Sequence, residues 1–382
     1  MPDARWDAPR EGPRSVRAHS GARTGPGSAD RSAAEPAEAP ADRTSPTARR
    51  GRPLLGAGLL VTAGLLVVAV WASLAFGSGD AASGDVLRAL FAQDLSEKAQ
   101  LIVWEERVPR TVAGLMAGVA LGLAGAVMQG VARNPLADPG ILGVNAGASV
   151  AVVTAIGLLG FGSPSEYIWF GLLGAFAATV LVYSVGSLGR DGATPVKLAL
   201  AGAATSAILG SVTTAILLTD RQVFDRFRFW KVGSLAGRDA ELLWQALPFI
   251  AVGVVLAMAL GPRLNTLSLG DDLARALGQR VGTARLVSAA TVMVLCGTAT
   301  AVVGPIAFVG LVVPHAARMF TGPDYRWILP YSALLAPVLM LVSDIVGRLI
   351  ARPGEVQVGI VTAVLGAVPF VILVRRRHLV EL

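Results

Sequence analysis

Long apolar segments joined by short polar ones make up the sequence from about residue 53 onward. Most of these segments have about the 20 residues that a helix needs to cross the hydrocarbon core of a bilayer. Their apolar residues are continuous and do not alternate with polar ones, which favours helices over a transmembrane barrel. The pattern therefore predicts an all-α polytopic membrane protein with about ten transmembrane helices. The expected helices cover residues 54–76, 111–131, 141–159, 167–187, 196–218, 242–260, 286–303, 306–320, 327–350 and 356–374.

Residues 1–52 differ sharply from this transmembrane domain, which we assign to residues 53–382. They are rich in Arg, Ala, Pro, Gly and Ser and have almost no large aliphatic side chains, so they cannot bury enough apolar area to fold. We expect a disordered tail and not a signal peptide, because the first apolar segment follows some fifty polar residues. The polar segment 77–106 contains one expected surface helix, 85–92, capped by Ser83.

Basic residues flanking the expected helices indicate how the chain is oriented in the cell membrane. Arg49, Arg50 and Arg52 precede the first helix, which favours a cytoplasmic N-terminus by the positive-inside rule. An even number of helices returns the C-terminus to the cytoplasm, where residues 375–377 are all arginine. One expected outer loop, 219–241, departs from the rule because it contains Arg221, Arg226, Arg228, Lys231 and Arg238.

The amino-acid composition narrows the class of protein further. Only 15% of the 382 residues are charged, against about 25% in soluble proteins. The formal net charge of +7 does not indicate nucleic-acid binding, because the basic residues are scattered over helix ends and the tail.

The segment 111–131 has a ridge of small residues formed by Gly114, Gly118 and Gly122, which recur every fourth position. Such a ridge lets a neighbouring helix approach closely, which is the usual packing device in lipid. We therefore expect this helix to pack tightly against another one.

A polar loop at 261–285 contains a short helix pattern at 269–278. Asp271 or Asp272 can cap such a helix, Asp271 and Arg275 are spaced as a pair, and Gly278 can end it. Leu273 and Leu277 form an apolar stripe. The helix is too short to cross the membrane, so it either lies on the membrane surface or docks into a cytosolic partner.

Few charged residues lie within the apolar segments. Asp344 and Arg348 are four residues apart near the outer end of one helix and could form a structural pair. Alternatively, Arg348 groups with Arg107 and Arg110 on the outer surface, where arginine forks suit carboxylates of a partner. Arginines at such positions can also be simple interface anchors.

The sequence offers no catalytic residues, cofactor site or metal site. His19, His315 and His378 are far apart in the sequence, and no His, Cys or carboxylate cluster has metal-ligand spacing. A phosphate-binding GxxxxGK[ST] loop is absent. If ATP powers this protein, another chain must bind it.

Several long motifs in order resemble the FecCD-type permeases of binding-protein-dependent ABC importers for iron–siderophore complexes, haem and cobalamin. The motifs are RVPR, GAVMQ, NPLADPGILGVNAGAS, GDDLARALG, GPIAFVGLVVPHAAR and SDIVGR followed by GIVTAVLGAVPFVIL. The resemblance covers about residues 55–378 and implies a type II ABC-importer permease fold.

The resemblance also implies partners and site residues. The partners are a second permease subunit, identical or not, two cytosolic ATPase subunits, an extracytoplasmic binding protein and a cargo, most often an iron–siderophore complex. Arg107, Arg110 and Arg348 would receive the binding protein. The ATPase-coupling element would be Leu269, Gly270, Asp271, Asp272, Leu273, Ala274, Arg275, Leu277 and Gly278.

Three alternatives stay open at this point. The cargo could be haem or cobalamin. The chain could be a secondary transporter that works alone, although it lacks a series of buried acids that could relay protons. It could also be a membrane-embedded enzyme or receptor.

Overall fold

The computed structural model describes residues 52–77, 101–189, 193–352 and 354–376, and this part of the chain is helical without strands. Residues from Arg50 onward belong to one compact unit. The expected tail and the expected surface helix at 85–92 lie outside the described residues.

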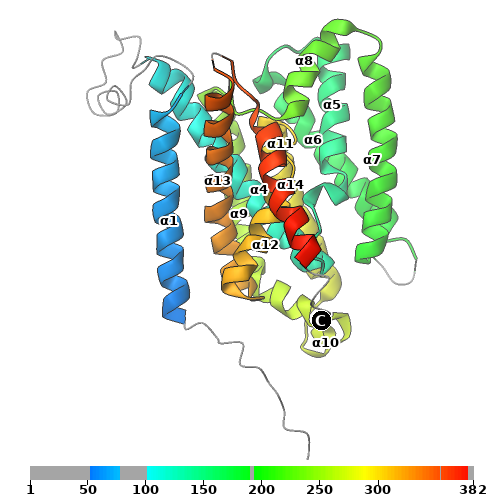
Figure 1. The fold of residues 1–382 in the computed structure, drawn as a ribbon. Coiled ribbons are helices and arrows are strands. Elements are labelled where there is room, and N and C mark those ends of the chain that lie inside the picture. The colour runs from blue at the N-terminus through cyan, green and yellow to red at the C-terminus, as the bar shows by residue number, and fades with distance from the viewer. Residues whose placement is uncertain (1–51, 78–100, 190–192, 353, 377–382) are drawn as a thin grey trace, which may run out of the picture. The chain divides into compact units, whose positions relative to one another are not determined.

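The helices follow one another with short connections (Figure 1). In chain order they are α1 (Arg52–Ala75), the π-helix η1 (Val103–Arg107), α4 (Val108–Ala132), the 3-10 helix η2 (Pro139–Leu142), α5 (Val144–Leu158), α6 (Pro164–Gly186), α7 (Pro195–Leu217), α8 (Arg221–Val232), α9 (Ala240–Ser268), α10 (Asp271–Ala276), α11 (Val281–Val303), α12 (Val309–Thr321), α13 (Tyr325–Ile350) and α14 (Val358–Arg376).

Each expected transmembrane segment coincides with a helix. Among the described residues, 7 helices are long and apolar enough to cross a membrane. The other three expected segments are the shorter helices α5, α12 and α14. The segment predicted at 306–320 is shortened because Phe308 has a left-handed backbone with φ 68°, so α12 begins only at Val309.

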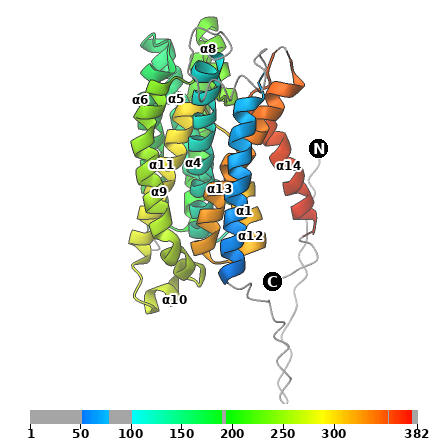
Figure 2. The same cartoon turned by 90° about the vertical axis from the view of Figure 1, so that its left-hand side faces the viewer.

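Helix α4 forms the centre of the bundle, with α9, α11, α12 and α13 packed around it (Figure 2). In the apolar window of α4, 83% of the residues are buried, against 11% for α1 at the edge. Ala and Gly make up much of the α4 sequence, and such small side chains let several helices approach it at once.

The glycine ridge of α4 lies against α13. A Cβ atom added to Gly118 would lie 2.5 Å from Cα of Pro337, and one added to Gly122 would lie 2.7 Å from the carbonyl of Ser332. Gly114 faces the side chain of Leu341. At Gly118 and Gly122 the neighbouring backbone itself occupies the space that a side chain would need.

Helix α8 corrects the expectation of a plain outer loop at 219–241. The side chain of Asp220 caps it by accepting a hydrogen bond of 2.6 Å from the backbone N–H of Gln222. Val223, Phe227 and Trp230 are buried on one face. The polar composition of the segment hid this amphipathic helix, whose apolar face is only one residue wide per turn.

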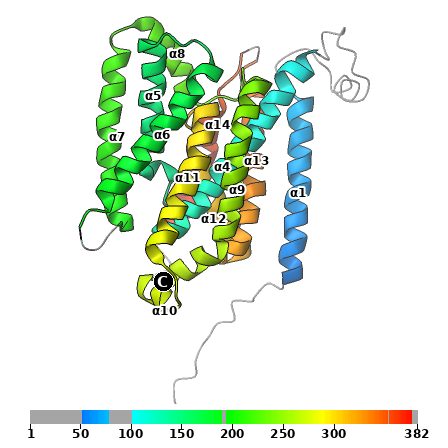
Figure 3. The ribbon, with the colours of Figure 1, turned by 180° about the vertical axis from the view of Figure 1, so that it is seen from behind.

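The two ends of the bundle carry different elements (Figures 1 and 3). Helix α10 and the start of α1 lie at one end, which we call the α10 end. Helix α8, the start of α4 and the end of α13 lie at the opposite end, which we call the α8 end. Helix α4 therefore runs from one end to the other.

Candidate functional site

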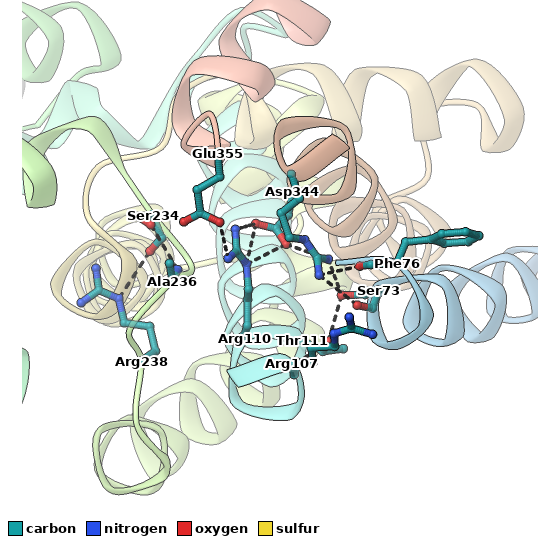
Figure 4. Close-up of polar contacts among 11 residues, drawn as sticks. Ser73, Phe76, Arg107, Arg110, Thr111, Ser234, Ala236, Arg238, Asp344 and Glu355 are labelled. Carbon is teal, nitrogen blue, oxygen red and sulfur yellow. Dashed lines mark hydrogen bonds and ion pairs between the residues drawn. The ribbon is translucent and has the colours of Figure 1, made fainter. Parts of the chain in front are cut away.

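Asp344 of α13 joins two arginines at the α8 end. Its carboxylate accepts hydrogen bonds of 2.7 and 3.0 Å from Arg110 of α4 and forms an ion pair of 3.0 Å with Arg348. Arg110 also donates a hydrogen bond of 2.7 Å to Glu355. The carboxylate is 0% exposed, so this cluster is a buried ion-pair network that ties α4 to α13 (Figure 4).

The same cluster holds the end of α1. Arg348 donates to the backbone carbonyls of Ser73 at 3.1 Å and Phe76 at 2.7 Å. Arg107 donates to the carbonyls of Leu74 at 2.8 Å and Ala75 at 3.2 Å. The last carbonyls of a helix have no partner within it and carry partial negative charge, so two guanidinium groups stabilise this end of α1.

The structure thus brings the three predicted arginines together and also forms the Asp344–Arg348 pair. Arg107 and Arg348 are only 4% and 2% exposed, so their guanidinium groups face the interior of the bundle. Sequence reasoning missed Glu355, Ser73 and the carbonyls of α1. It had no signal for them, because Glu355 lies 245 positions from Arg110 and Ser73 lies 275 positions from Arg348.

Another arginine of the α8 end, Arg238, is also buried. It lies between α8 and α9 and donates a hydrogen bond of 3.4 Å to the carbonyl of Ser234 (Figure 4). Burial lowers the pKa of this guanidinium, and the neighbouring Tyr167 and Asp239 partly oppose that shift. Arg238 therefore has a structural environment and is not part of an open basic surface.

At the α10 end, Asp271 joins three elements. Its carboxylate accepts hydrogen bonds of 3.0 and 2.9 Å from Arg285 of α11 and pairs at 3.1 Å with Arg133, the residue that follows α4. Arg285 also donates 3.0 Å to the carbonyl of Ala193, just before α7. The first residue of α10 is thus fixed to the ends of α4 and α11.

The remaining face of α10 points away from the bundle. The side chain of Asp272 is fully exposed and pairs with Arg275 at 2.9 Å. Leu269, Leu273 and Leu277 are exposed large hydrophobics, whereas Ala274 is buried. The two aspartates, equivalent in the sequence, therefore differ: Asp271 attaches the helix and Asp272 is displayed on it.

The caps of α10 differ in part from the prediction. Neither aspartate caps the helix, because the N-cap residue is Gly270 with φ 102° and no side-chain hydrogen bond is made there. Both aspartates instead occupy the first turn, where their charge favours the helix dipole. The predicted Asp271–Arg275 pair is long, at 3.8 Å. Gly278, with φ 82°, follows the C-cap Leu277 and ends the helix as expected.

A pocket of about 480 Å³ lies between α5, α7 and α8. Lys231, near the end of α8, donates a hydrogen bond of 3.0 Å to the hydroxyl of Ser149 on α5. Burial lowers the pKa of this ammonium. The lining residues are Gly140, Asn145, Ala146, Ser149, Ser206, Gly210, Thr213, Thr214, Leu217, Phe227 and Lys231. No pattern in the sequence connects Lys231 with Ser149.

Within the described residues, no group of three or more His, Cys, Asp or Glu side chains could hold a metal ion. The polar groups instead connect helices. Gln129 of α4, for example, donates 3.0 Å to the carbonyl of Leu311 in α12, and Asn145 of α5 accepts 2.9 Å from Thr300 of α11.

Comparison with known proteins identifies the family to which this chain belongs. The model of the FecCD transport family matches residues 65–376. The chain belongs to the FecCD transport family. Among its FecCD relatives, the ferric enterobactin transport system permease protein FepD of Escherichia coli is 45% identical over 320 residues, which are 84% of this chain and 94% of the relative. The probable siderophore transport system permease protein YfiZ of Bacillus subtilis is 40% identical over 312 residues, 82% of this chain and 93% of the relative.

A solved structure supports the fold of this FecCD chain. It is an inward-facing conformation of a protein described as a metal-chelate type ABC transporter, with a TM-score of 0.74 and 29% sequence identity. The match covers 84% of this chain and 99% of that one. The chain is therefore an all-α, multi-pass membrane protein with an ABC-transporter permease fold, as the sequence predicted.

Proposed function

We propose that this chain is the membrane-spanning permease subunit of a binding-protein-dependent ABC importer that carries an iron–siderophore complex across the cytoplasmic membrane. The observation that carries the proposal is the FecCD match over residues 65–376. The relatives support the cargo, since FepD is a ferric enterobactin permease and YfiZ a probable siderophore permease.

The complete importer in this proposal contains a second permease subunit, two cytosolic ATPase subunits and an extracytoplasmic binding protein. Both termini are cytoplasmic, as is the α10 end. The common position of α10 and the start of α1 at one end of the bundle supports this orientation (Figure 1).

The geometry of α10 supports a role in coupling ATP hydrolysis to movement. The exposed Asp272, Leu273 and Leu277 would contact an ATPase subunit. Asp271 would then pass the displacement of α10 to α4 and α11, through Arg133 and Arg285. Because α4 is packed on all sides, its displacement would move its neighbours as well.

The exposed face of α7 with small and polar residues supports a translocation path beside this helix. Gly210, Ser211 and Thr214 are exposed on it, whereas a helix face in contact with lipid ordinarily carries large aliphatic side chains. We propose that this face turns toward the second permease subunit and the translocation path.

The docking role of Arg107, Arg110 and Arg348 stays a prediction, and their contacts within the chain give a competing structural explanation. Both explanations can be separated by replacing each arginine with glutamate and measuring binding-protein affinity and thermal unfolding together. Docking predicts a salt-sensitive loss of affinity in protein that remains folded. A lower unfolding temperature with normal affinity of the folded fraction would leave only the structural role.

Reconstitution tests the proposed function directly. Proteoliposomes that contain the permease, the ATPase subunits and the binding protein should accumulate a ferric siderophore when ATP is supplied. Asp272→Lys should abolish this uptake while the protein stays folded, because it reverses a fully exposed charge whose partner among the described residues is the exposed Arg275. Uphill uptake by the permease alone would contradict the proposal and favour a secondary transporter.

A further inference from the structure

Among the described residues that line the pocket between α5, α7 and α8, Lys231 is the only charged one. The remaining walls are hydroxyl, amide and small apolar groups, together with the side chains of Leu217 and Phe227. The pocket volume of about 480 Å³ is in the range of known small-ligand sites. A single cation beside hydroxyl and amide groups in a pocket of this size can attract an anion.

The ammonium of Lys231 has no acidic partner among the described residues. Its hydrogen bond goes to the neutral hydroxyl of Ser149. The acids of α8 are used elsewhere, since Asp220 caps the helix and Asp225 pairs with Arg228 at 3.5 Å. Asp138, near the pocket in sequence, accepts from the backbone of Gly140 and does not line the pocket.

The side chain of Lys231 is exposed, so its ammonium is accessible to an ion that enters the pocket. An anion there would be attracted by a positive charge that no acidic side chain on the pocket wall offsets. A lysine at a membrane interface can also extend to lipid headgroups, but the contact with Ser149 of α5 directs this ammonium toward the pocket wall.

We propose that Lys231, with Ser149 and Asn145 beside it, forms an anion-recognition subsite that favours negatively charged ferric chelates over neutral ones during translocation. This inference rests on the proposed function and specifies its cargo class. A ferric ion held by catecholates is an anion, because each catecholate carries two negative charges. A ferric ion held by three hydroxamates is neutral, so Lys231 gives it no charge-based advantage.

Transport by the complete importer tests the charge preference. We expect Lys231→Met to lower the initial uptake rate of a ferric tris-catecholate about tenfold at low substrate, the size of one charge contact. Uptake of a ferric tris-hydroxamate should be unchanged, and Lys231→Arg should keep most of the tris-catecholate rate. Arg228→Met is the matched control, since it removes another basic residue of α8 that already has an acidic partner.

Two outcomes would overturn the inference while leaving the proposed function intact. One is an equal loss for both chelates in Lys231→Met, which would mean a structural role. The other is no loss for either chelate, which would mean an interface anchor. If the wild type took up neither chelate with ATP, the proposed function would fail and this inference with it.

Chemical labelling gives a second test that does not need transport of two chelates. The chain has a single cysteine, Cys296, which is buried. In a Cys296→Ser background that keeps Lys231, Thr214→Cys places a thiol on the wall of the same pocket. This thiol should react with a water-soluble thiol reagent faster in the absence of the ferric tris-catecholate than in its presence. Equal rates in both conditions would contradict an anion subsite at this position.

Discussion

The two ends of the bundle carry the same kind of charge cluster in opposite states of exposure. In each, one aspartate joins arginines from two different parts of the chain: Asp344 joins Arg110 and Arg348 at the α8 end, and Asp271 joins Arg133 and Arg285 at the α10 end. The first cluster is sealed among α1, α4 and α13. The second is half-open and forms the attachment of an exposed helix.

This difference indicates what each cluster can do. A sealed network fixes helices relative to one another, because its charges have no water to replace a lost partner. A half-open cluster loses less free energy when an ion pair breaks, because water can replace the lost partner. Such a cluster can therefore move with the helix that it attaches. Arg110 lies in the first turn of helix α4 and Arg133 follows its last residue, so α4 connects the two clusters.

Asp344→Asn should have the largest effect on stability. It leaves Arg110 and Arg348 buried without their shared countercharge, which costs about 3–5 kcal/mol when a buried pair is broken. The free energy of unfolding of detergent-purified protein measures this. Glu355→Gln is the control, because Glu355 is partly exposed and should cost less than about 1 kcal/mol. Similar losses in both variants would mean that the cluster is not sealed.

Gly118→Ala should have the second largest effect on stability. It tests the packing of α4, the helix that connects the two clusters. The added Cβ would lie 2.5 Å from Cα of Pro337, so α4 and α13 must separate, at a cost of about 1–3 kcal/mol. The control is Gly64→Ala in α1, where no atom lies within 4 Å of the added Cβ. If both variants have the same free energy of unfolding, α4 and α13 do not pack as closely as the structure shows.

Asp271→Asn should have a smaller effect on stability, below about 1 kcal/mol, because its ion pairs are partly exposed. Its effect on function should be larger, since α10 would lose its fixed position on α4 and α11. We expect ATP-driven uptake to fall while ATP hydrolysis by the assembled importer continues. An unchanged ratio of uptake to hydrolysis would contradict the role of Asp271 as the attachment.

The sequence predicted the parts of this fold that depend on local pattern. Continuous apolar segments marked each transmembrane helix, and the four-residue spacing marked the Asp344–Arg348 pair. Helix α8 was not predicted, because its burial depends on the helices around it and not on its own mean hydropathy. The start of α12 was not predicted, because it depends on the left-handed backbone of Phe308. A phenylalanine carries no sequence signal for such a conformation.

The candidate sites were predictable only as residue types. The sequence identified Asp271, Asp272 and the three arginines, but it could not say which of them face the interior. That depends on partners far away in the chain: Arg285 lies 14 positions from Asp271, and Arg348 reaches α1 across 275 positions. Contacts over such separations follow from the packing of whole helices, which no local pattern encodes.

Arg275→Ala should give the smallest effect and is the sharpest test of the displayed face of α10. Arg275 pairs with Asp272 at 2.9 Å, and both side chains are exposed, so the free energy of unfolding should change by less than about 0.5 kcal/mol. Removing this arginine leaves Asp272 as an unpaired surface charge, which alters the electrostatic complementarity of any contact made there. Association with the purified ATPase subunit should therefore change at low ionic strength and return to the wild-type value at high salt, where surface charges are screened. A change that persists at high salt would mean that α10 itself had shifted, and the displayed face would then be as structural as the sealed cluster at the other end.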